Sequence, residues 1–269
     1  MNYPSIFNDV IGPVMRGPSS SHCVASLRIG RICHDLMGGR ISTIAIDFDP
    51  EGSLATTHKD QGSDMGLFGG FLGWEAYDER LVDSEMHLGA AGIQAKITIK
   101  ELQEKHPNTY QITLRNPWET HQVIAISTGG GMIEVLEIDG VRVSLAGDCF
   151  LTLIYSSDSS KLDSYFGQAK LPEDLEVHAH DQGILILKSQ AFLDELLLEE
   201  IKAIDGVNSI KQVKPVLPVL TAKNQAVPFI TCEEMLAYNE DKKLHLWELA
   251  VRYETVSYTH LRAHETVLD

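Results

Sequence analysis

The sequence has few cysteines, a deficit of basic residues and no long hydrophobic run. Its 269 residues include only 4 cysteines, none in C-x-x-C spacing. This argues against a disulfide framework or a zinc site and favours the reduced thiols of a cytoplasmic protein. The 22 basic residues are outnumbered by 38 acidic ones, and the net charge of −16 excludes non-specific binding to nucleic acid. Since there is no run of about 18 apolar residues and no basic leader, we expect neither a membrane span nor secretion.

What the chain does contain is typical of a globular protein with mixed secondary structure. It is 43% hydrophobic and 22% charged, and its length suits one large or two moderate domains. Alternating apolar and polar runs predict strands, and apolar residues at helical spacing predict helices. The fold class predicted is therefore α/β (α+β) with a mixed sheet. The strands expected in the first 150 residues are 41–49, 94–99, 109–114, 121–127, 132–138 and 141–145, and the helices begin near residues 19, 65 and 84.

Three further segments follow residue 150. Residues 151–220 predict the order β-α-β-β-α-β, with helices at 161–168 and 191–204, which is the ferredoxin-like pattern of small regulatory domains. Residues 221–255 read as a linker and an amphipathic helical stretch from Cys232, possibly broken near 239–242. The last segment, 256–269, looks like a translated sequencing adapter, so we exclude it and expect the natural protein to be longer.

Gly17-Pro18-Ser19-Ser20-Ser21-His22 is the most informative stretch. Pro18 disfavours helix at Gly17, and the serines are favoured N-caps for the amphipathic helix that follows. The hydroxyls and His22 would then surround a helix N-terminus, where free N–H groups and the helix dipole favour an anion. The alternative is that the serines only cap the helix.

Three other stretches carry candidate binding groups. Residues 52–64 collect hydroxyls, an imidazole, an amide and carboxylates after a strand, either as a binding loop or as a polar surface loop. Residues 106–109 favour a plain turn. Ser127-Thr128-Gly129-Gly130-Gly131 follows a strand, and its glycines form either an anion-binding nest or only a bend.

Together these stretches resemble the β-domain of the iron–sulfur-dependent L-serine dehydratases over about residues 3–150. The matching strings are Ser5-Ile6-Phe7, Ile11-Gly12-Pro13-Val14, Gly17-Pro18-Ser19-Ser20-Ser21-His22, Gly52-Ser53-Leu54-Ala55, Gly62-Ser63-Asp64, His106-Pro107-Asn108-Thr109 and Gly129-Gly130-Gly131. The resemblance implies a lyase that converts L-serine to pyruvate and ammonia. It also implies a [4Fe–4S] cluster that polarises the substrate hydroxyl.

The same resemblance implies roles for particular residues and partners. His22, Ser20 and Ser21 would be catalytic. Substrate contacts would come from Ser19, Ser53, Gln61, Asp64, Thr128, Gly129 and Gly130. The cluster ligands would lie in an α-domain or α-chain, so we expect no metal site here and no activity from this chain alone. Residues 151–220 stand where relatives carry an ACT-like regulatory domain, 221–255 resemble the first helices of the α-domain, and we expect a homo-oligomer.

Two departures from the family pattern affect the chemistry. Cys23 stands where the family usually has threonine, and Gln61 stands where it has histidine. Glutamine forms hydrogen bonds but does not titrate near neutral pH. The substrate is therefore open between L-serine, L-cysteine and L-threonine. The alternative function is a non-catalytic amino-acid- or anion-binding allosteric module.

Overall fold

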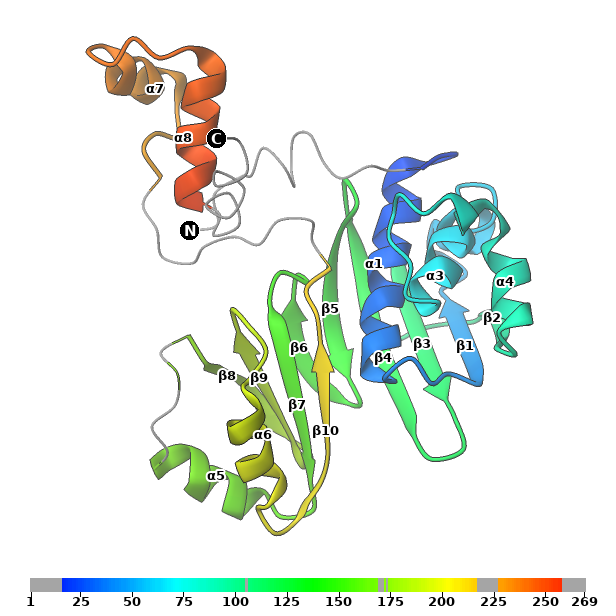
Figure 1. Ribbon diagram of the computed structural model, residues 1–269. Helices are drawn as coiled ribbons and strands as arrows, with labels where there is room; N and C mark the ends of the chain where they lie inside the picture. The colour runs from blue at the N-terminus through cyan, green and yellow to red at the C-terminus, as the bar shows by residue number, and fades with distance from the viewer. Residues whose placement is uncertain (1–15, 105, 169–171, 173, 217–226, 258–269) are drawn as a thin grey trace. The chain divides into compact units, whose positions relative to one another are not determined.

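The computed structural model describes residues 16–104, 106–168, 172, 174–216 and 227–257. The chain divides into two units, Met15–Val216 and a second unit formed by Met1–Val14 and Leu217–Asp269. Figure 1 shows the first unit as two sheets with their helices.

The larger sheet has the strand order β2-β1-β3-β4-β5-β6. Its strands are β1 (Thr43–Phe48), β2 (Gln94–Ile99), β3 (Thr109–Arg115), β4 (Thr120–Gly129), β5 (Met132–Ile138) and β6 (Val141–Leu145). β1 and β2 are parallel, and the other neighbours are antiparallel. The predicted strands 132–138 and 141–145 are confirmed as β5 and β6, which form a hairpin whose turn, Asp139-Gly140, has positive φ at both residues.

Helix α1 (Ser20–Leu36) packs its apolar stripe on this sheet. Ile29 and Ile32 belong to the same buried cluster as Ile112 and Val123 of the sheet. Four shorter helices follow β1: α2 (Leu54–Thr57), α3 (Ser63–Phe71), η2 (Glu79–Asp83) and α4 (Ser84–Ala90). Figure 1 shows α1 beside α3.

Glycines allow α1 and α3 to touch along their backbones. A Cβ atom at Gly66 would lie 2.0 Å from the carbonyl oxygen of Cys23, and one at Gly70 would lie 2.3 Å from that of Leu27. A Cβ at Gly30 would meet the carbonyl oxygen of Leu67 at 2.5 Å. The helix predicted to begin near residue 65 is therefore confirmed, and its glycines put it in backbone-to-backbone contact with α1.

The second sheet has the strand order β10-β7-β9-β8, and all its neighbours are antiparallel. Its elements are β7 (Phe150–Ser156), α5 (Ser159–Gln168), β8 (Glu176–Asp181), β9 (Ile184–Ser189), α6 (Glu195–Lys202) and β10 (Val207–Val213). One face packs on α5 and α6 through Ile154, Leu162 and Ile201. The other face adds Leu153 and Ile186 to the core of the larger sheet.

The second unit shows α7 (Cys232–Asn239) and α8 (Leu246–Ser257). Thr231 and Glu234 form a capping box at the start of α7. The predicted break is confirmed: the side chain of Asn239 bonds the backbone of Leu244, and Lys243 has a φ of 52°.

The mixed α/β class is confirmed, and three local predictions need correction. The segment 52–64 is not a continuous loop, because it contains α2 and the first turn of α3. Helix α6 is shorter than the predicted 191–204, because Asp194 caps it by accepting from the N–H of Leu197. Ser19 occupies the N-cap of α1 without a side-chain capping bond. The predictions made for residues 1–15, 217–226 and 258–269 lie outside the described residues.

Candidate active site

The topology brings the predicted site segments to one edge of the larger sheet. β1 and β4 end at this edge and β3 begins there, since β3 is antiparallel to both. A short connection joins the end of α1 to the start of β1, so α1 begins at the same edge. The serine-rich segment, the loop after β1 and the turn after β4 therefore meet.

The first turn of α1 holds a serine–histidine pair. The hydroxyl of Ser19 lies 2.8 Å from Nδ1 of His22, which is why it does not cap the helix. Ser20 is exposed, and Ser21 and His22 are half-buried. The 17-residue helix α1 directs its free N–H groups and the positive end of its dipole towards these hydroxyls. This arrangement suits a carboxylate ligand.

The segment that precedes α3 lies against this turn. The backbone N–H of Ser19 donates to the carbonyl oxygen of Gln61 at 3.3 Å. Gly62 has a φ of 79°, and a Cβ there would meet the Pro18 ring at 3.2 Å. The side-chain Oε1 of Gln61 is buried and has no hydrogen-bond partner among the described residues. A donor group of a ligand would satisfy it.

His58 and Asp64 form a second imidazole pair beside the first. Nδ1 of His58 lies 2.8 Å from both carboxylate oxygens of Asp64, and the His58 ring lies at a tilt of 41° to the Phe48 ring, with centroids 5.3 Å apart. Burial raises the pKa of Asp64 above its usual value, although the hydrogen bond and charge of His58 act in the opposite direction. The site therefore contains an imidazole three residues before Gln61.

Ser53 contacts the turn before β3. Its hydroxyl donates to the amide oxygen of Asn108, and its backbone N–H donates to the carbonyl oxygen of Pro107 at 2.8 Å. The N–H of Ser127, near the end of β4, donates to the carbonyl oxygen of Asn108 at 3.1 Å. Residues 106–109 form a turn, as predicted, and this turn connects the loop after β1 to the end of β4.

Thr128, Gly129 and Gly130 are exposed at the tip of the β4–β5 hairpin. Gly129, Gly130 and Gly131 all have positive φ, and a Cβ at Gly129 or Gly130 would meet no atom of the described residues within 4 Å. The buried side chain of Arg28 donates from Nη1 to the carbonyl oxygen of Gly131 at 2.5 Å. Arg28 thus holds the tip against α1.

The cysteines do not form a metal centre in the part of the chain that the structure describes. No group of three or more His, Cys, Asp or Glu side chains there could hold a metal ion. Burial raises the pKa of the Cys23 thiol to about 11, partly opposed by the charge of Arg16. Cys33 and Cys149 are also buried, whereas Cys232 is exposed. Separately, no described helix has both the length and the apolar character that a membrane span needs.

The structure thus joins most, but not all, of the predicted site residues through direct contacts. The Ser19–His22 turn contacts Gln61, and Asp64 is bound to His58 in the same segment. Ser53 and residues 128–130 lie at the same edge without a hydrogen bond to His22 among those that the described residues make. The sequence analysis missed the roles of His58, Asn108 and Arg28. Arg28 did leave a signal, because it is a charged residue on the apolar stripe of α1.

Comparisons with known proteins agree with the sequence resemblance. The chain is 33% identical over 217 residues to the probable L-serine dehydratase beta chain of Bacillus subtilis (strain 168), which covers 77% of this chain and 96% of that protein. It is 31% identical over 159 residues to the L-serine dehydratase beta chain of Peptoniphilus asaccharolyticus, which covers 58% of this chain and 71% of that one. No protein-family model matches the chain. At this identity and coverage, the chain belongs to the L-serine dehydratase beta-chain family.

Proposed function

We propose that this chain is the substrate-binding component of an L-serine ammonia-lyase, which converts L-serine to pyruvate and ammonia. The names of its relatives support the reaction. The observation that carries the proposal is the Ser19–His22 pair at the start of α1, in contact with the segment of Gln61 and Asp64. This places anion-binding groups, an imidazole and a buried amide oxygen together.

Each group has a specific role in the proposed site. The substrate carboxylate binds at the N-terminus of α1, to N–H groups and the hydroxyls of Ser20 and Ser21. Ser19 holds the His22 ring through Nδ1, which leaves Nε2 to exchange a proton with the substrate. The unpartnered Oε1 of Gln61 accepts a hydrogen bond from the substrate ammonium group. Residues 128–130 and Ser53 provide further substrate contacts at the same edge of the larger sheet.

The described residues do not fit a [4Fe–4S] cluster. Such a cluster needs several thiolates at one place. Cys23 and Cys33 are instead buried thiols whose pKa values are raised by burial, and no described group of ligands surrounds them. We propose that an α-domain or α-chain holds the cluster and that this chain alone is inactive.

The second sheet, together with α5 and α6, is proposed to form an ACT-like, ferredoxin-like regulatory module. Its β-α-β-β-α-β order and its strand order β10-β7-β9-β8 support this assignment. The proposed domains are 1–150, 151–220 and 221–255.

The test of this function is reconstitution. The full chain is purified without oxygen together with its cognate α-chain, and pyruvate release is measured with L-serine, L-threonine and L-cysteine. We expect release from L-serine by the complex and none from either component alone. Full activity of the α-component alone, or no release from the complex with any of the three substrates, would refute the proposal.

The non-catalytic alternative predicts a different result. It is favoured by one observation: the anion-binding groups at the N-terminus of α1 all lie within this chain. An amino-acid- or anion-binding module would bind L-serine by calorimetry and release no pyruvate in the reconstituted complex.

A further inference from the structure

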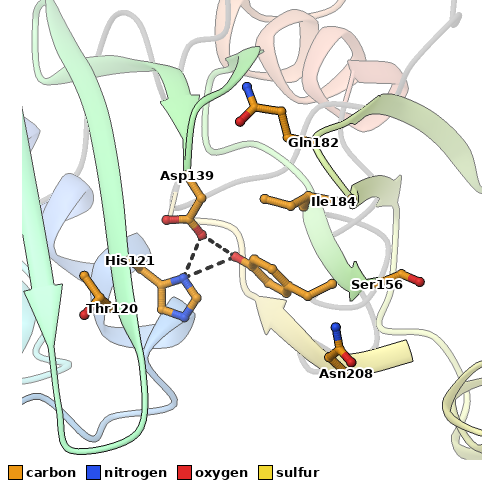
Figure 2. A pocket seen from close by; sticks show the side chains of 9 residues that line it. Thr120, His121, Asp139, Ser156, Gln182, Ile184 and Asn208 are labelled. Carbon is orange, nitrogen blue, oxygen red and sulfur yellow. Dashed lines mark hydrogen bonds and ion pairs between the residues drawn. The ribbon is translucent and has the colours of Figure 1, made fainter. Parts of the chain in front are cut away.

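Apart from the candidate active site, a polar pocket lies where the two sheets of the first unit meet. It has a volume of about 350 Å³, within the range of small-molecule sites. Thr120, His121 and Asp139 line it from the larger sheet, and Tyr155, Gln182 and Asn208 line it from the other sheet. Figure 2 shows these side chains around the pocket. It borders the start of β4, whereas the candidate active site lies at the end of that strand.

Asp139 organises the pocket. Its Oδ2 accepts from the Tyr155 hydroxyl at 2.7 Å and lies 2.7 Å from Nδ1 of His121, and its Oδ1 accepts from the N–H of Gln122 at 2.7 Å. Burial alone would raise the pKa of Asp139, but these three hydrogen bonds outweigh it and hold the pKa below its usual value. The carboxylate is therefore ionised at neutral pH. Since a carboxylate accepts about four hydrogen bonds, one place remains.

None of the described residues that line the pocket is a lysine or an arginine, and its basic side chain, His121, is already paired with Asp139. Lys211 of the second sheet is bound to Glu119. An anionic ligand is therefore disfavoured, and a cationic group is favoured.

His121 offers a second polar atom. It is only 6% exposed, and its Nε2 has no hydrogen-bond partner among the described residues. The carboxylate of Glu119 lies 3.5 Å from Nε2, which is a long contact. Because Nδ1 faces Asp139, Nε2 is the ring atom left for a ligand. The amide oxygens of Gln182 and Asn208 are further acceptors at the rim.

We infer that this pocket binds a small ammonium compound that also carries a hydroxyl group. Such a molecule supplies several N–H donors and a positive charge to Asp139, and its hydroxyl, which both donates and accepts, pairs with Nε2 of His121. Two sources share this chemistry, a simple amine and a free hydroxy-amino acid. The inference does not rest on the proposed lyase activity.

Calorimetric titration of the full chain tests the inference. The probes are ethanolamine, ammonium chloride and L-serine, and tetramethylammonium chloride is the control that has the charge but no N–H donors. We expect saturable binding of ethanolamine and none of tetramethylammonium. If L-serine also binds at this pocket, a free amino acid is the source; if only ethanolamine does, the source is an amine without a carboxylate. Equal binding of tetramethylammonium, or no binding of ethanolamine, would overturn the inference.

Two variants locate the binding. Asp139→Asn keeps a residue that tolerates the left-handed conformation of the turn and removes the charge, so ethanolamine should bind at least about tenfold more weakly. Asn208→Trp adds bulk to the pocket from an exposed lining position, and it should abolish binding of ethanolamine. Asp241→Asn, an exposed carboxylate of the other unit, is the matched control and should bind like the wild type. Wild-type binding by the Asn208→Trp variant would show that the ligand lies elsewhere.

Discussion

Replacing Gly66 by alanine should force α1 and α3 apart and destabilise the first unit. The new Cβ would lie 2.0 Å from the carbonyl oxygen of Cys23 and 2.6 Å from the hydroxyl of Ser26. Carbon and oxygen atoms approach to about 3.3 Å at closest. The helices must therefore separate by about 1 Å, because a backbone carbonyl within a helix has no rotamer to change.

Two opposing terms set the magnitude. Alanine is about 1 kcal/mol more favourable than glycine inside a helix. Overpacking costs about 1–3 kcal/mol and more when backbone must move, so we expect a net loss of about 2 kcal/mol. For a unit of this size, each kcal/mol lowers Tm by about 2–4 °C. The expected drop is therefore about 4–8 °C.

Gly89→Ala in α4 is the matched control. A Cβ there would meet no atom of the described residues within 4 Å, so this substitution should leave Tm unchanged or raise it by about 2–4 °C. Thermal unfolding of both variants, followed by circular dichroism, makes the comparison. If Gly66→Ala melts at or above the wild-type temperature, the close helix contact described here is wrong.

Four other predictions concern single side chains. In the reconstituted complex, His22→Ala should lower kcat/KM by about 10²–10⁴-fold with little change in Tm; wild-type kcat/KM would remove His22 from the proposed mechanism. Burial raises the pKa of Asp64, so its ionised form opposes folding above that pKa; Asp64→Asn should raise Tm near neutral pH, and a lower Tm would contradict this. The folded protein lowers the pKa of Asp139, so the Asp139 carboxylate stabilises the fold above its unfolded pKa of about 3.9. This stabilisation is lost as the pH falls through the folded pKa. The Tm difference between wild type and Asp139→Asn should therefore shrink from about pH 6 to about pH 3. Iodoacetamide should label the exposed Cys232 first, and mass spectrometry that finds Cys33 labelled equally fast in the folded chain would contradict its burial.

The strands were the most predictable part of this fold. The bounds of β2, β5 and β6 match the sequence prediction, because each is a short apolar–polar run between turn residues. The ends of the helices were predicted less accurately than the ends of the strands. At α6 the deciding interaction is a single Asp194 cap, and at α1 the hydroxyl of Ser19 bonds His22 instead of the backbone. Such choices depend on competing partners of similar energy.

The site was predictable in position but not in its contacts. The sequence showed which segments carry hydroxyls and imidazoles, and the edge of the sheet gathers them. It did not show that His58 pairs with Asp64 or that Arg28 reaches Gly131, which is 103 positions away in the chain. The first contact depends on the turn between α2 and α3, and the second depends on the packing of α1 against the β4–β5 hairpin.

The sequence of the second sheet also contained a signal that this sheet packs on the larger one. In an antiparallel sheet with one face in water, polar residues alternate with apolar ones. The run Leu151–Tyr155 and the run 184–187 instead contain almost no polar residue. The structure explains this, because Leu153 and Ile186 pack on the larger sheet while Ile154 and Leu187 pack on α5 and α6. An unbroken apolar run in an antiparallel strand therefore indicates that both faces are covered. Since one face belongs to the unit's own helices, a second layer was to be expected, and the larger sheet supplies it.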